Sequence, residues 1–146
     1  IYTMLAQIEQ EEGAAMDAAA RAAYASIDGG GLLHVFSTGH SHMIVEEMFY
    51  RSGGLVPVNP ILSDELMLHT GAITSTHMER MPGKAAEVLG KAGLRAGDTI
   101  LISSNTGINT VPVRPEATGC SRSPAPSRSQ AARPPSEACS SRSASY

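Results

Sequence analysis

The chain has 146 residues, of which 42% are hydrophobic, so it is long enough for one domain with a buried core. Aromatic residues make up only 4% and Trp is absent, which argues against a large aromatic stacking platform. The net charge of -3 and the lack of a basic stripe argue against nucleic acid as a partner. No stretch approaches the roughly 20 apolar residues that span a bilayer, and no signal peptide is recognisable. We therefore expect a cytoplasmic protein with no membrane partner.

The first third of the chain predicts a helix, a strand and a second helix. Residues 2–27 combine strong helix formers with apolar residues at helical spacing, and Gly13 is a candidate break. Three glycines follow, and the apolar run LLHVFS at 32–37 predicts a short buried strand. After the turn TGHSH, apolar residues at helical spacing predict a helix over 43–51.

The next part of the chain predicts further alternation. Residues 55–58 predict a second short strand, and residues 63–70 and 76–92 predict two helical segments. The run TILISS at 99–104 predicts a third strand that ends in the polar sequence NTGINT. Strands that alternate with helices are typical of a parallel sheet with helices on both faces, that is, a three-layer αβα fold.

The composition changes after Val113. Residues 114–146 are mostly Ser, Arg, Pro and Ala, with almost no large aliphatic side chain, so they are unable to build a core. Two explanations stay open, a disordered tail and a reading frame that shifts near Val113, and we favour the shift. Both cysteines, Cys120 and Cys139, lie in this segment without a metal-like spacing, so we expect neither a disulfide framework nor a zinc site.

Two polar loops are candidates for binding an anion. The first, FSTGHSHM at 36–43, leaves a strand and enters a helix, where Thr38, Gly39 and Ser41 could contact a phosphate. Ser41 could equally be an ordinary helix cap. The second, at the end of the 99–104 strand, places hydroxyl and amide side chains where ligands of open parallel sheets bind, and an ordinary turn is the alternative. Its candidates are Ser104, Asn105, Thr106, Gly107 and Asn109.

These two loops together resemble the phosphosugar site of SIS (sugar isomerase) domains. The stretch HVFSTGHSHMIVEEMFYRSGGLVPVNPIL is similar to bacterial proteins described as phosphoheptose-isomerase-like, and the likeness continues through residues 67–80 and 95–113. The usual second loop carries Ser where this chain has Thr106, and often Thr where it has Asn109. The resemblance implies a five-stranded parallel sheet, of which residues 1–113 would be the N-terminal part, and at least a homodimer in the complete protein.

Isomerisation of a sugar phosphate needs a base that moves a proton between neighbouring carbons. His40, His42 and Glu47 lie on or just after the first loop and are the candidate catalytic residues, although Glu47 could belong to a solvated helix face. His34, inside a strand, reads better as a core residue with its hydrogen bonds satisfied. His40 and His42 would diverge at a helix start, so we expect no metal. The sequence GxGxxG is absent after the first strand, so we expect no dinucleotide cofactor.

Three functional hypotheses follow from the sequence. The chain binds a phosphorylated sugar and isomerises it, or acts on an amino sugar phosphate. Alternatively, it is a non-catalytic sensor of phosphosugars, because SIS domains also serve in regulators. The third hypothesis is an inactive fragment, because a sheet that ends near residue 113 would leave an apolar strand edge uncovered.

Overall fold

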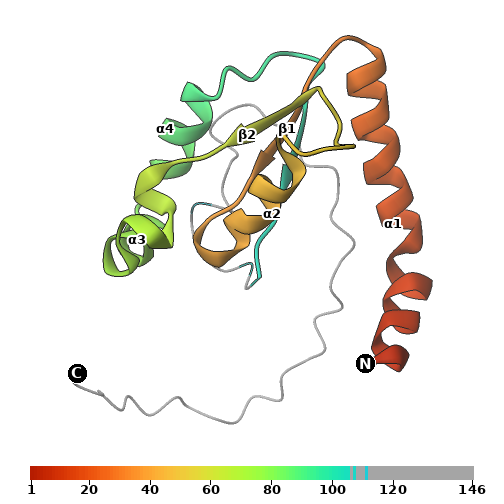
Figure 1. Ribbon diagram of the computed structural model, residues 1–146, viewed down its shortest axis with the longest axis horizontal. Helices are drawn as coiled ribbons and strands as arrows, with labels where there is room; N and C mark the ends of the chain where they lie inside the picture. Colours follow the sequence, from red (N-terminus) through yellow and green to blue (C-terminus); the bar gives the residue numbers. More distant parts are fainter. Residues whose placement is uncertain (106, 108–110, 112–146) are drawn as a thin grey trace.

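The computed structural model describes residues 1–105, 107 and 111. These residues form a three-stranded parallel sheet with helices on both faces (Figure 1), which confirms the predicted α/β class. The elements in chain order are helix α1 (Tyr2–Asp28), strand β1 (Leu33–Phe36), the 3-10 turn η1 (Gly39–Ser41), α2 (His42–Met48), β2 (Val58–Ile61), the 3-10 turns η2 (Asp64–Leu66) and η3 (Leu68–Thr70), α3 (Ala72–Met78), α4 (Lys84–Lys91) and β3 (Thr99–Ile102).

The strand order is β2-β1-β3, with β1 in the centre of the described sheet. Leu33 pairs with Val58 on one side and Thr99 on the other, and this register continues to Phe36. Alternate residues of β1 face opposite sides, so Leu33 and Val35 pack with α1 and α2. Phe36 packs on the other face with Ala85, Val88 and Leu89 of α4. The two cores make the sheet the middle layer of three.

The second strand is Val58–Ile61 and not residues 55–58, so that prediction was wrong. Leu55 and Val56 are instead exposed in the loop before the strand. Pro60 is tolerated inside β2 because its nitrogen points away from β1. The Leu33 N–H donates to the Pro57 carbonyl, and the alternation of a parallel ladder then turns the backbone groups of Val58 and Pro60 outward.

The outer edge of β2 therefore offers almost no hydrogen-bond donors. Pro60 has no N–H, and the N–H of Val58 donates to the Val56 carbonyl at 2.9 Å. The outer edge of β3 differs, because Ile100 and Ile102 both carry an N–H and a carbonyl that point away from β1. The two edges of the described sheet are thus chemically unlike.

The predicted helix over 76–92 is two helices. Pro82 and Gly83 separate α3 from α4, and Gly83 adopts a left-handed φ of 81° that interrupts a helix. The segment 63–70 contains two 3-10 turns, and not one α-helix. The long first helix runs through Gly13 without a break. Helix α3 begins at Ala72, four residues before the predicted start at residue 76.

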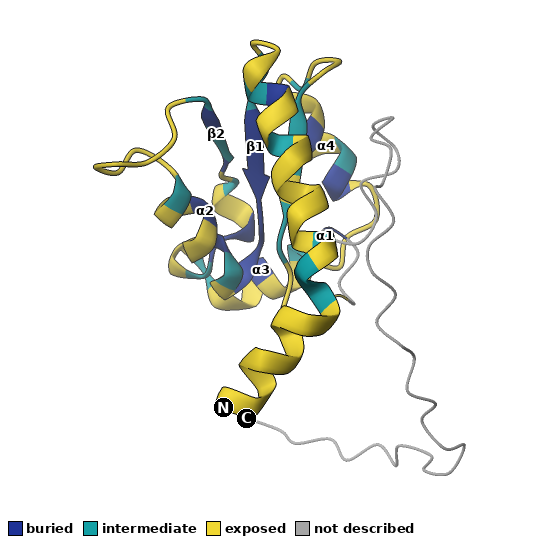
Figure 2. Cartoon of the chain, turned by 90° about the vertical axis from the view of Figure 1, so that its right-hand side faces the viewer, coloured by how far each residue is buried: buried dark blue, intermediate teal, exposed yellow. Residues whose placement is uncertain are grey.

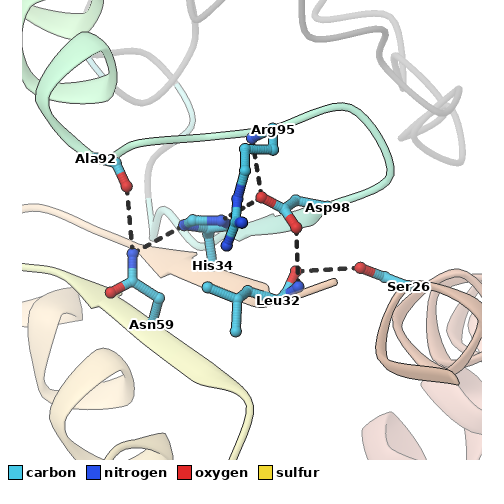
Figure 3. Close-up of polar contacts among 7 residues, drawn as sticks. All are labelled: Ser26, Leu32, His34, Asn59, Ala92, Arg95 and Asp98. Carbon is cyan, nitrogen blue, oxygen red and sulfur yellow. Dashed lines mark hydrogen bonds and ion pairs between the residues drawn. The ribbon is translucent and has the colours of Figure 1, made fainter. Parts of the chain in front are cut away.

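A buried polar network joins the amino ends of β1 and β3 (Figure 3). The carboxylate of Asp98 accepts hydrogen bonds from the Leu32 N–H (2.9 Å), the Arg95 N–H (2.9 Å) and His34 Nε2 (3.0 Å). Asn59 Nδ2 donates to His34 Nδ1 at 2.9 Å, so the neutral His34 carries its proton on Nε2. His34 is fully buried with both ring nitrogens satisfied, which confirms the prediction of a core histidine.

The same network stabilises the ionised form of Asp98. Hydrogen bonds from the Leu32 N–H, then the Arg95 N–H, then His34 hold the pKa of Asp98 at about 2, below its ordinary value of 3.8. The side chain of Asp98 is only 3% exposed. The network therefore links Leu32 and His34 to Asp98, which lies more than sixty positions away in the sequence.

Candidate functional site

The winding of the chain reverses at β1. The connection from β1 to β2 passes through α2 on one face, and the connection from β2 to β3 passes through α4 on the other. In open parallel sheets, ligands bind outside the carboxyl ends of the two strands between which this reversal occurs. Here those strands are β1 and β3, which are neighbours in the sheet.

Both predicted loops begin at this point and are held side by side. Ser103 N donates to the Phe36 carbonyl at 3.1 Å, and Ser37 Oγ donates to the Ser103 carbonyl at 2.7 Å. Gly107 N donates to Ser104 Oγ at 3.0 Å, which folds the second loop into a turn. The structure thus brings together two segments that the sequence could only pair by analogy.

A pocket of about 300 Å³ lies between the two loops and the third helix. Its lining residues are Thr38, Gly39, His40, Ser41, Leu68, Ser75, Thr76, Glu79, Ser104 and Asn105. Six of them were predicted site residues. Hydroxyl and amide groups dominate the lining, and none of these residues is Lys or Arg.

Several predicted residues lie elsewhere or outside the described part of the chain. Gly107 is in the second loop but does not line the pocket. Thr106 and Asn109 lie outside the described residues. The roles given to these three positions stay predictions.

The predicted acid–base residues occupy three different environments. His40 is exposed and lines the pocket. His42 is buried below the loop, where its Nδ1 donates to the Gly39 carbonyl and its Nε2 lies 3.6 Å from Glu46 Oε1. Glu47 is 69% exposed, pairs with Arg51 on the surface of α2, and does not line the pocket. Of the three, only His40 has direct access to a ligand in this pocket.

Glu79, near the end of α3, is a pocket residue that the sequence analysis missed. Its Oε1 lies so close to Gly39 that a Cβ atom there would be 2.9 Å away, and Gly39 has a left-handed φ of 57°. Both features favour glycine at position 39. No local motif marks Glu79, because α3 and the first loop meet only through the fold.

Two further observations concern polar groups near the strand ends. Ser103 Oγ is buried and has no hydrogen-bond partner among the described residues. Ser75 Oγ, fully buried, donates to the Leu66 carbonyl at 2.9 Å and so connects α3 to η2. In the part of the chain that the structure describes, no three His, Cys, Asp or Glu side chains gather as metal ligands would.

A larger pocket of about 480 Å³ lies between α4 and the outer edge of β2. Its two lysines are already neutralised: Lys84 Nζ pairs with Glu65 and Glu87, and Lys91 Nζ pairs with Glu87 at 2.7 Å. It lies away from the carboxyl ends of β1 and β3, so it lacks the features that favour an anionic ligand there.

Comparison with known proteins identifies the family of this chain. Residues 1–120 match the SIS domain. The chain belongs to the SIS domain family. The match confirms the resemblance seen in the sequence. It extends seven residues past Val113. The domain boundary at Val113 and the shifted reading frame both stay predictions.

Curated relatives of this SIS chain are UPF0309 proteins, a name that states no activity. The relative from Halalkalibacterium halodurans is 44% identical over 112 residues, which cover 77% of this chain and 44% of that protein. The Geobacillus thermodenitrificans relative is 44% identical over 95 residues, covering 65% and 38%. The Brucella ovis relative is 46% identical over 81 residues, covering 56% and 34%. The chain thus spans less than half the length of these relatives.

The helices of the described SIS residues were compared with the requirements for spanning a membrane. None of them combines the length and the apolarity that crossing a bilayer requires.

Proposed function

We propose that the pocket at the carboxyl ends of β1 and β3 binds a phosphorylated sugar. The observation that carries this proposal is the convergence of two hydroxyl-rich loops on one cavity at the point where the winding of the sheet reverses. Membership of the SIS family supports phosphosugar binding in general terms.

The lining groups suit the polar part of such a ligand. Thr38, Ser41 and Ser104 offer hydroxyl donors for phosphate oxygens, and Asn105 offers an amide that can pair with sugar hydroxyls. Thr106 and Asn109 are proposed to add to the same set from the second loop. Because none of the described lining residues is Lys or Arg, phosphate would be held there by neutral donors.

The finer proposal is aldose-ketose isomerisation. A base takes a proton from the carbon beside the carbonyl group, the hydroxyl proton on that carbon passes to the carbonyl oxygen, and the protonated base returns its proton to the former carbonyl carbon. Among the described lining residues, His40 and Glu79 are the titratable ones, and we assign the proton transfer to them. Through its bond to the Gly39 carbonyl, His42 would position the first loop.

A non-catalytic sensor is the second candidate. Its specific support is that Glu47 lies on the surface of α2 and that the buried ring of His42 is hydrogen-bonded to the Gly39 carbonyl. Two of the three bases expected from the sequence are therefore absent from the pocket lining, and a binding module needs none of them.

Binding is tested by titrating the chain calorimetrically with a panel of hexose and pentose phosphates, their unphosphorylated sugars and inorganic phosphate. We expect sugar phosphates to bind and the plain sugars to bind far more weakly. Ser41→Ala removes a hydrogen bond to a charged group and should weaken binding about tenfold or more. Ser52→Ala, in the exposed loop after α2, is the matched control and should leave affinity unchanged. Equal affinity for wild type and Ser41→Ala would contradict the proposed site.

Catalysis is tested with the ligands that bind. Deuterium from solvent should enter the sugar beside the carbonyl carbon if the chain is an isomerase, and proton NMR detects this exchange directly. His40→Ala and Glu79→Gln should abolish exchange while binding persists. Binding without any exchange across the panel would favour the sensor.

We also propose a homo-oligomer, which the family resemblance implies for the complete protein, and a cytoplasmic location, where phosphorylated sugars are found. Sedimentation velocity tests the first proposal and fractionation of cells the second.

A further inference from the structure

His42 makes two contacts that its neutral form is unable to satisfy together. Its Nδ1 donates to the Gly39 carbonyl, and its Nε2 lies 3.6 Å from Glu46 Oε1, one helical turn further along α2. A neutral imidazole has one N–H and one lone pair, so a neutral ring that donates through Nδ1 turns the lone pair of Nε2 toward a carboxylate. An imidazolium has an N–H on both nitrogens and suits both partners.

The ring of His42 is enclosed by protein. It is 8% exposed and is one of the two buried residues of α2, a helix that otherwise lies at the surface (Figure 2). The titratable groups that face it are Glu46, the exposed His69 of η3 at 5.8 Å between ring centroids, and Glu79 of α3, which lies close to the same loop. The two carboxylates favour a positive charge on His42, whereas a protonated His69 and the amino end of α2 oppose it.

The proposed phosphate pocket contains no basic side chain among its described lining residues other than the exposed His40. Glu79 adds a carboxylate to the lining, which repels an anionic ligand. His42 does not line the pocket, but its hydrogen-bond partner Gly39 does. A charge on His42 would therefore act on a bound anion across a single loop residue, where little water screens it.

We propose that His42 supplies the positive counter-charge of the phosphosugar site, and that a bound anion and the second proton of His42 stabilise each other. His42 acts through the loop, so it is a positioning residue and not a direct ligand. Because such coupling is reciprocal, loss of the proton weakens anion binding. Histidine side chains exchange this proton between about pH 5 and 8. The inference rests on the proposed phosphosugar site and adds a dependence on pH.

Calorimetric titration of the 146-residue chain with inorganic sulfate and with glucose 6-phosphate, at pH 6, 7 and 8, tests the coupling. The charge of sulfate is constant over this range, whereas a phosphate ester gains negative charge as the pH passes about 6. We expect the affinity of the wild type for sulfate to fall about tenfold between pH 6 and pH 8, because His42 loses its charge.

The variant His42→Asn separates charge from hydrogen bonding. Its amide still offers an N–H to the Gly39 carbonyl, but it does not titrate. At pH 6 its affinity for sulfate should be about tenfold weaker than that of the wild type, and nearly constant up to pH 8. For glucose 6-phosphate, the ratio of wild-type to variant affinity should show the same fall with pH. In His40→Asn, by contrast, the pH dependence of sulfate binding should persist.

Nitrogen-15 NMR of the imidazole rings measures the charge of His42 directly, with and without sulfate. Sulfate should raise the protonated fraction of His42 at pH 7. Glu46→Gln should lower this fraction in the free chain, because it removes the carboxylate beside Nε2. Glu47→Gln, on the exposed surface of the same helix, is the matched control and should leave the fraction unchanged.

The outcomes separate this inference from the proposed function. Far-UV circular dichroism checks that each variant retains its fold, and the NMR measurement decides the question if His42→Asn does not. Sulfate affinity that is independent of pH, a pH dependence that survives His42→Asn or vanishes in His40→Asn, or a neutral His42 in the sulfate-bound chain would each overturn the inference while leaving phosphosugar binding intact. If neither sulfate nor any sugar phosphate binds, the proposed function and this inference are both wrong.

Discussion

Replacing His34 by Leu tests the polar network that joins the strands. His34 is fully buried, and its two ring nitrogens make hydrogen bonds of 3.0 and 2.9 Å, the first to an ionised carboxylate. Loss of one neutral and one charge-assisted hydrogen bond costs His34→Leu about 3 kcal/mol, and the more apolar Leu side chain recovers about 1 kcal/mol. We expect the free energy of unfolding at pH 7 to fall by about 2 kcal/mol.

The pH dependence separates hydrogen bonding from packing. Because the folded-state pKa of Asp98 is about 2, below its ordinary 3.8, its contribution to stability is present above pH 4 and lost as the pH falls toward 2. His34→Leu removes one of three donors, so the folded-state pKa of Asp98 rises and the acid-dependent loss of stability becomes smaller.

Urea unfolding followed by far-UV circular dichroism, at pH 7 and at steps down to pH 2, measures both effects. His77→Leu, on the exposed face of α3, is the control, and we expect a change within about 0.5 kcal/mol. If His34→Leu matches wild type at pH 7, or loses stability in acid with the same profile, the network does not stabilise the fold as described.

Two further predictions concern the pocket and α4. Gly39→Ala should lower the free energy of unfolding by about 1–2 kcal/mol, because Ala is strained at a φ of 57°, and should weaken phosphosugar binding by shifting the loop that carries Thr38 and Ser41. Urea unfolding and calorimetry check this, and no change in either would refute it. Hydrogen bonds to Glu65, then Glu87, raise the pKa of Lys84 above its ordinary value of 10.5. The contribution of these bonds to the free energy of unfolding is therefore present below pH 10.5 and is lost as the pH rises further. The double variant Glu65→Gln/Glu87→Gln should therefore destabilise the chain more than Lys84→Met, since it leaves a buried ammonium unpaired. The stability of the double variant should recover as the pH approaches 10. Equal losses of stability in the two variants, measured by urea unfolding, would contradict this.

The sequence predicted the parts of the fold that depend on local pattern. The runs around Val35 and Leu101 are short and apolar between turn residues, and both are strands of the parallel sheet. The second strand was misplaced because Leu55 and Val56 look like strand residues, whereas the prolines that follow are usually excluded from strands. Only the position of β2 at an edge makes Pro60 acceptable, and that position is a property of the whole sheet.

In the candidate site too, the sequence predicted what local pattern determines and missed what depends on the whole fold. The two loops follow strands, so the sequence could locate Thr38, Ser41 and Ser104 near one edge. Glu79 reaches that edge from a helix whose start the sequence misjudged, and its approach to Gly39 depends on the packing of α3 against η1. The partner of His34 was equally hidden, since Asp98 lies sixty-four residues away.

The unlike edges of the sheet have a consequence for how this chain can misassemble. An incoming strand needs donors and acceptors in alternation, and β2 presents carbonyl groups without matching N–H groups. The edge formed by β3 presents both, beside a Leu101 side chain that is 38% exposed. Strand-mediated aggregates of the described domain would therefore add new strands through β3 and stop at β2. A proline introduced at Ile100 or Ile102 would remove an outward N–H as Pro60 does at the other edge, at the cost of an isoleucine side chain that packs against the core.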